Sequence, residues 1–182
     1  MDDLVKRASE EAARFLDAPA LAQRWVHVQA VGVRAAELAA TVDSADRDLL
    51  VAAALLHDIG YAPELVVTGF HPLDGARHLE RAGFSGRLVA LVAHHSGARF
   101  EAAERGLLRE LEVYPLEESP VMDALVAADL TIGPHGQRLT YDERLDEILT
   151  RYPADSVVHR AISRARPVLV VHLDRVNARV SR

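Results

Sequence analysis

The sequence contains no cysteine, few aromatic residues and no long apolar segment. Without cysteine, neither disulfide bonds nor thiolate metal ligands can form, and a reducing compartment is permitted. The N-terminus is charged and lacks the apolar core of a signal peptide, and no apolar run approaches the length of a membrane span. We therefore expect a cytoplasmic protein without a membrane partner.

An excess of positive charge is also missing. The 182 residues include 21 basic and 27 acidic side chains, which gives a formal net charge of −6. The basic residues, nearly all arginine, are scattered among acidic ones, whereas proteins that bind double-stranded nucleic acid usually present a basic stripe. We therefore expect no double-stranded nucleic acid partner, while a local phosphate pocket stays compatible with the pattern.

Apolar residues at helical spacing occur over almost the whole chain, and no convincing stretch alternates as a strand would. With 49% hydrophobic residues, the chain can bury the core of one domain. We predict an all-α fold, a single-domain helical bundle over 1–182, with a core at about 20–135 and C-terminal helices at 140–179 packing on it. The expected helices are 3–17, 20–41, 44–60, 71–83, 85–95, 99–111, 120–130, 140–152 and 155–179, the last with a kink at Pro167.

The most informative feature is the pair His57-Asp58, which follows the apolar run 49–56 and precedes Ile59-Gly60. At helical spacing, both side chains project from faces lined with hydrocarbon. A carboxylate in such surroundings is costly unless a cation or several donors balance it. A bound metal ion would satisfy both residues, because imidazole and carboxylate are ordinary ligands of first-row metals. The alternative is a buried helix end in which Asp58 caps a neighbouring element.

Other histidines and aspartates stand where they could join the same site. His27 lies in the middle of a predicted helix, and Asp129 shares a predicted helix face with apolar residues. His71 opens a helix, where its ring could instead cap backbone donors. The pair His94-His95 ends another helix, and the two side chains point about 100° apart, so that one can bind a metal while the other faces substrate or solvent.

The order of these residues resembles the H…HD…D signature of the HD-domain superfamily of metal-dependent phosphohydrolases. Arg-x-x-His at 24–27 and His-Asp-Ile-Gly at 57–60 carry the resemblance, which covers roughly residues 20–135. It implies a helical bundle in which a divalent metal is held by His27, His57, Asp58 and Asp129.

Some branches of the superfamily, including the HD-GYP and diadenosine-polyphosphate hydrolase types, add histidines that hold a second metal. His71 and the His94-His95 pair stand where those additions fall, and Asp58 would then bridge two ions. We favour His94 as the ligand and His95 as a second ligand or a phosphate donor. Tyr61 replaces a lysine that often follows HDIG and contacts phosphate. The GYP element is absent, which argues against cyclic dinucleotides as substrate.

The ligand set that the resemblance implies suits one or two ions of iron, manganese, zinc or cobalt. Such ions activate water and stabilise an in-line displacement at phosphorus. We therefore expect a metal-dependent phosphohydrolase, a phosphomonoesterase or phosphodiesterase, that uses metal-activated water on a small phosphorylated compound, with a nucleotide as first candidate. Asp58 would hold that water. Arg24, one turn before His27, would contact phosphate, with a surface salt bridge as the alternative. His95 is the third residue, after Asp58 and Arg24, for which we expect a catalytic role.

Other functions stay open. A di-iron oxygenase of the HD type would use the same ligands, and a non-catalytic HD module would bind a metal or ligand without turnover. A purely structural scaffold leaves the buried Asp58 and Asp129 unexplained. The apolar run 168–171 is read as core or as the surface of a homodimer. Surface or packing roles are expected for the remaining histidines, His78, His135, His159 and His172.

Overall fold

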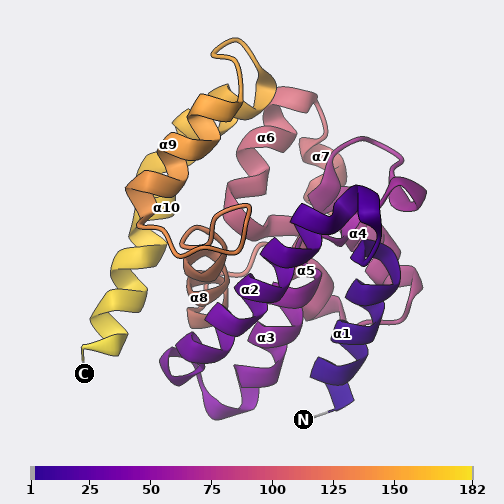
Figure 1. Ribbon diagram of the computed structural model, residues 1–182, viewed down its shortest axis with the longest axis vertical. Coiled ribbons are helices and arrows are strands. Elements are labelled where there is room, and N and C mark those ends of the chain that lie inside the picture. The colour runs from indigo at the N-terminus through magenta and orange to yellow at the C-terminus, as the bar shows by residue number, and fades with distance from the viewer. Residues whose placement is uncertain (1–2, 182) are drawn as a thin grey trace.

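The computed structural model describes residues 3–181, which fold into helices joined by short turns (Figure 1). Within this range, β pairing is limited to an isolated bridge between Ile132 and Arg138. The α-helices are α1 (Asp3–Leu16), α2 (Ala22–Leu38), α3 (Arg47–Leu56), α4 (His71–Arg81), α5 (Gly86–His94), α6 (Ala98–Arg105), α7 (Leu108–Leu111), α8 (Pro120–Asp129), α9 (Tyr141–Arg151) and α10 (Val157–Val180).

The all-α prediction is confirmed. The single-domain organisation stays a prediction, and its bounds at residues 1 and 182 lie outside the residues described. Across residues 3–181, every helix is too short or too polar to span a lipid bilayer.

Helix α3 forms the centre of the fold, because it packs against α1, α2, α5 and α8. Its sequence is apolar on nearly all sides, as expected of a helix surrounded by others. Gly32 of α2 lets these two helices approach closely, since a Cβ atom there would lie 2.6 Å from Cδ2 of Leu55. The same burial places the residues that follow α3 in the interior.

The predicted helix 44–60 is too long, because α3 ends at Leu56 and a 3-10 turn, η4 (Ile59–Tyr61), follows. Asp58 leaves the helical conformation with φ −103° and ψ 10°. Gly60 then packs against the start of α4, where a Cβ atom would lie 2.1 Å from the carbonyl oxygen of His71. Only a residue without a side chain fits this contact, which brings Asp58 next to His71.

A further helix prediction differs from the structure. The predicted helix 99–111 is divided at Gly106, whose φ of 71° ends α6 before the short α7 begins. Pro167 lies inside α10, as the sequence indicated, and the kink at this residue stays a prediction.

Helices α9 and α10 cover one side of the molecule (Figure 1). Helix α10 packs against α6 and α8, and α9 packs against α10. A capping box between Thr140 and Glu143 fixes the start of α9. The apolar face of α10, which includes Ala161, Ala165 and Leu169, is buried. This packing holds α9 next to the end of α8.

Candidate metal centre

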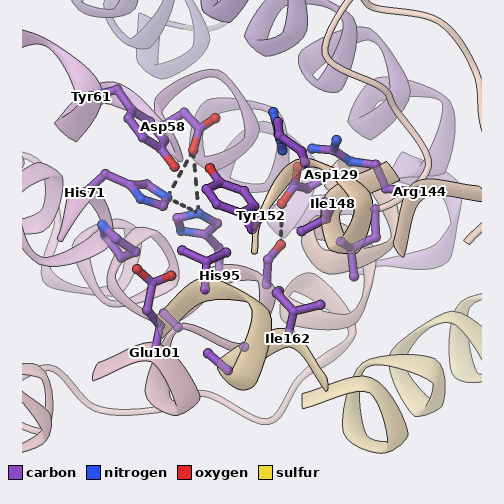
Figure 2. Close-up of a pocket in the computed structure, with 18 of the residues that line it drawn as sticks. Asp58, Tyr61, His71, His95, Glu101, Asp129, Arg144, Ile148, Tyr152 and Ile162 are labelled. Carbon is purple, nitrogen blue, oxygen red and sulfur yellow. Dashed lines mark hydrogen bonds and ion pairs between the residues drawn. The ribbon is translucent and has the colours of Figure 1, made fainter. Parts of the chain in front are cut away.

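Histidine and aspartate side chains from distant parts of the sequence converge where α3 ends. One group contains Asp58, His71 at the start of α4, and His95 after α5 (Figure 2). Nε2 of His71 lies 3.2 Å from Oδ1 of Asp58 and 3.3 Å from Nε2 of His95. Nε2 of His95 lies 3.8 Å from the same carboxylate oxygen. These three ligand atoms therefore face a common point.

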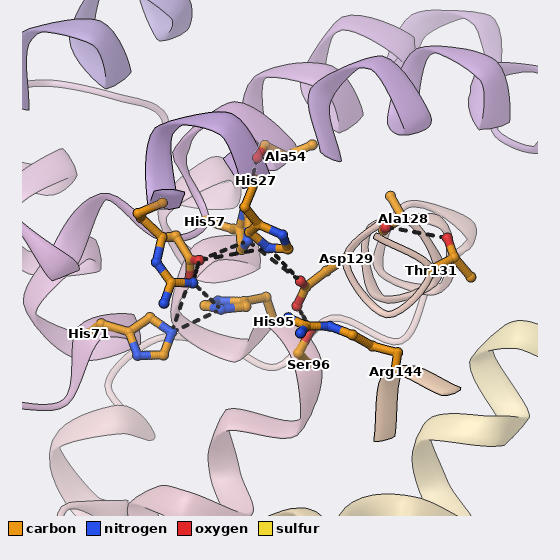
Figure 3. Close-up of polar contacts among 12 residues, drawn as sticks. His27, Ala54, His57, His71, His95, Ser96, Ala128, Asp129, Thr131 and Arg144 are labelled. Atoms are coloured by element: carbon orange, nitrogen blue, oxygen red, sulfur yellow. Dashed lines mark hydrogen bonds and ion pairs between the residues drawn. The ribbon is translucent and has the colours of Figure 1, made fainter. Parts of the chain in front are cut away.

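A second group contains His27 of α2, His57 and Asp129, the last residue of α8 (Figure 3). Oδ1 of Asp129 lies 3.1 Å from Nε2 of His27 and 3.7 Å from Nε2 of His57. All three residues are buried. The structure thus brings together residues that the sequence separates by about a hundred positions.

Asp58 connects the two groups through its two carboxylate oxygens. Oδ1 faces His71 and His95, whereas Oδ2 lies 3.4 Å from Nε2 of His57 and 3.9 Å from Nε2 of His27. One carboxylate therefore presents an oxygen to each group, which is the geometry needed to bridge two cations.

Backbone hydrogen bonds fix the ring orientation of the three buried histidines, His27, His57 and His95. In each ring, Nδ1 lies within hydrogen-bond distance of a backbone carbonyl, which can only accept. Nδ1 therefore carries a proton, and Nε2, once it has no proton of its own, presents its lone pair to the site. This arrangement is typical of metal-binding histidine. The carbonyl oxygen of Gly133 lies 3.1 Å from Nδ1 of His27, that of Ala54 2.7 Å from Nδ1 of His57, and that of Val92 2.6 Å from Nδ1 of His95.

The residues fit a divalent transition metal. Nε2 of His57 is buried and finds no hydrogen-bond partner within residues 3–181, although two carboxylates lie nearby. Burial lowers the pKa of His57, but the carboxylates of Asp58 and Asp129 together with the hydrogen bond to the carbonyl of Ala54 outweigh this and raise the pKa to about 9. The site thus favours a positive charge at this position, and an ion bound to Nε2 would supply it.

The pKa values of two other residues also suit metal ligation. Burial lowers the pKa of His95 to about 4, so the ring is neutral at physiological pH. Burial raises the pKa of Asp58, but the charges of Arg24 and His57 overcome this effect and hold it well below its usual value. Asp58 is therefore an ionised carboxylate in a buried position.

Arg24 of α2 lies at the edge of the site. Its guanidinium forms an ion pair with Oδ2 of Asp58, and its Cζ atom lies 4.0 Å from the centre of the Tyr61 ring. The Tyr61 ring in turn stacks on His71, with 4.0 Å between ring centres. Arg24 is thus not a surface residue paired with another surface charge, and Tyr61 orients both Arg24 and His71.

Ser96 supports the site in a way that sequence patterns did not reveal. Its hydroxyl donates a hydrogen bond to Oδ2 of Asp129, which leaves Oδ1 directed at His27 and His57 (Figure 3). Ser96 has a positive φ of 48°, which is unusual for a residue other than glycine. The backbone is therefore strained beside a candidate ligand, as is often seen at functional sites.

The structure corrects the preference for His94 over His95. Nε2 of His94 donates to the carbonyl oxygen of Tyr114 at 2.8 Å, so this ring is directed away from both ligand groups. Helix α5 ends at His94, and the ring of His95, whose Nδ1 bonds to the carbonyl of Val92, lies in the site beside Asp58 and His71. The position predicted for His94 is therefore occupied by His95.

The remaining histidines lie outside both groups, as expected. Their contacts are Glu11 for His78, Gln23 for His135, the carbonyl of Tyr152 for His159, and Asp123 for His172.

A cavity opens beside the ligand groups (Figure 2). One side is formed by candidate ligands, and the opposite side by residues of α9 and α10 together with the loop that joins them. No motif in the sequence marks these opposing residues, which include Arg144, Ile148, Tyr152 and Ile162.

Comparison with known proteins agrees with this geometry. The sequence profile of the HD domain family matches residues 24–130, more than half of the chain. The matched segment begins at Arg24 and ends directly after Asp129. The chain therefore belongs to the HD domain family.

Part of the chain is also similar to a protein that is named as a methyltransferase. The tRNA (cytidine(56)-2'-O)-methyltransferase of Thermoplasma volcanium is 38% identical over 78 residues, which cover 43% of this chain. The chain matches only 22% of that protein's length. No solved structure matches the chain.

Proposed function

We propose that this protein is a metal-dependent phosphohydrolase that acts on a small phosphorylated compound, with a nucleotide as first candidate. The observation that carries the proposal is the position of Asp58. Oδ1 of Asp58 faces His71 and His95, and Oδ2 faces His57 and His27, so Asp58 would be a ligand shared between two ions. When bound, such ions lower the pKa of a water molecule and neutralise phosphoryl oxygens.

The chain's own residues divide the remaining work. His27, His57 and Asp129 would hold one ion, and His71 and His95 the other, with Asp58 shared between them. Arg24 would contact a phosphate oxygen, because its guanidinium lines the cavity beside Asp58. Ser96 keeps Asp129 in its orientation.

The two other activities have weaker support. Methyl transfer rests only on the relative's name, and the match covers 22% of that protein. A di-iron oxygenase has in its favour the imidazole-rich ligand set, which suits iron. The arginines that line the cavity, Arg24, Arg144 and Arg151, favour an anionic substrate and hence the hydrolase.

The experiment combines elemental analysis with two activity assays. The purified protein is stripped of metal, reloaded with manganese, zinc, cobalt or iron, and tested for phosphate release from a panel of esters that includes nucleotides. We expect two ions per chain and metal-dependent phosphate release. Oxygen consumption by the iron-loaded protein without phosphate release from any ester would overturn the hydrolase in favour of the oxygenase.

Variants link the activity to the site. We expect Asp58→Asn to lose phosphate release, because the shared ligand loses its charge. The matched control is His135→Gln, which alters an exposed histidine outside both ligand groups. Phosphate release that persists in Asp58→Asn would contradict the proposed chemistry.

A further inference from the structure

Helix α9 lies outside the segment that matches the HD domain family, yet it contributes to the wall of the cavity. Arg144, Glu147 and Arg151 occupy positions i, i+3 and i+7 and therefore share one face of this helix. Glu147 forms ion pairs with both arginines, and Nε of Arg151 lies 3.4 Å from its Oε1. Two guanidinium groups held by one carboxylate leave an excess positive charge on this face.

Arg144 is the unusual member of the set. Only 5% of the residue is exposed, although arginine is rarely buried without full pairing. Its side chain is directed toward Asp129 and Ser96 (Figure 3). Nε of Arg144 is buried without an acceptor in the described part of the chain. Folding alone therefore leaves one donor of this guanidinium unused.

Arg144 also lies where two cavities meet. The first cavity is lined by Asp58, His71, His95 and Asp129. The second is lined by residues that include Gln23, His27 and Pro134. Both cavities share the same four residues, Arg24, Tyr61, Arg144 and Arg151.

We propose that Arg144, assisted by Arg151, binds a second phosphate of the substrate, while the phosphate to be hydrolysed lies at the ligand groups. This inference rests on the proposed function and narrows it to compounds that carry two linked phosphates, such as a nucleoside diphosphate. A guanidinium suits this role because its fork of donors binds two oxygens of one phosphate. A compound with a single phosphate leaves Arg144 without this partner.

The test measures binding rather than turnover. Metal-loaded protein is titrated calorimetrically with methylenediphosphonate, which resists hydrolysis, and with methylphosphonate, its counterpart with one phosphorus. We expect the wild type to bind the diphosphonate at least about tenfold more tightly, equivalent to about 1.4 kcal/mol. Metal content is measured after each titration, so that removal of metal by the ligand is detected.

Arg144→Gln is the decisive variant. We expect it to weaken diphosphonate binding about tenfold or more, while methylphosphonate binding changes less than about threefold. Arg166→Gln is the matched control. Arg166 of α10 pairs at 3.0 Å with Asp142 of α9, the helix that carries Arg144, but it lines neither cavity. This control removes the same charge and should leave both affinities unchanged.

The outcomes separate the inference from the proposed function. Equal affinity of the wild type for both ligands, or an equal loss of both in Arg144→Gln, overturns the role of Arg144. If Arg144→Gln does not fold, Arg144→Lys and Arg151→Gln carry the same test, since each should reduce the preference for the diphosphonate. If the preference is present but no ester releases phosphate, the hydrolase fails while the second-phosphate site stands.

Discussion

Gly60 offers a direct test of how the ligand group of Asp58, His71 and His95 is assembled. In Gly60→Ala, the added Cβ atom would lie 2.1 Å from the carbonyl oxygen of His71 and 2.6 Å from the backbone nitrogen of Gly75. Both neighbours are backbone atoms, so they cannot move aside as a flexible side chain would. The backbone of η4 and the start of α4 must therefore separate by about an ångström to restore ordinary contact distances.

The cost should resemble that of an overpacked core, about 1–3 kcal/mol in the free energy of unfolding. For a domain of this size, each kcal/mol lowers the melting temperature by roughly 2–4 °C. The same separation moves His71 away from Asp58, whereas His27, His57 and Asp129 belong to other elements. We therefore expect Gly60→Ala to keep one ion per chain and to lose the other.

Elemental analysis and thermal denaturation measure the two effects. Gly86→Ala is the control, because no atom lies within 4 Å of a Cβ at this exposed first residue of α5. We expect the control to retain both ions and to be at least as stable as the wild type, since alanine reduces the freedom of the unfolded chain. A Gly60→Ala protein with two ions and an unchanged melting temperature would refute this account of the site.

Three further predictions concern the ligands and their support. Ser96→Ala and Ser96→Gly both lose the hydrogen bond to Asp129, so we expect each variant to weaken metal binding about 10–100-fold. Glycine adopts the positive φ of this position readily, so thermal denaturation should show Ser96→Gly to be the more stable of the two. Wild-type metal affinity in both variants would exclude a supporting role for Ser96. The pKa of His57 is raised to about 9 without metal, so below this pH a metal ion must displace a proton from the ring. Competition titrations should show the metal affinity falling as the pH falls from 8.5 to 6.5, about tenfold per pH unit for this proton. A metal affinity that does not change with pH would contradict the assignment of His57 as a ligand. We expect His95→Gln to lose one ion and the activity, and His94→Gln to keep its ions and its activity. Elemental analysis measures the ions, and phosphate release measures the activity. The reverse result would restore His94 as the ligand.

The amino-acid sequence was sufficient to predict the helical fold and most candidate ligands. Periodic apolar residues require a helical core, and that information is local to each segment. The run 49–56 is apolar on every side, so His57 and Asp58 had to follow it into the interior. The spacing of His27, His57-Asp58 and Asp129 then matched a family pattern that covers more than half of the chain.

Other features depend on contacts between residues that are distant in the sequence. His94 and His95 are adjacent and chemically identical, and the carbonyl of Tyr114 takes the first ring out of the site. The approach of Asp58 to His71 depends on the contact between Gly60 and the start of α4. Arg144 reaches the cavity because α10 holds α9 beside it. Periodicity places a residue on a face of its own helix, whereas the packing of other helices determines what that face meets.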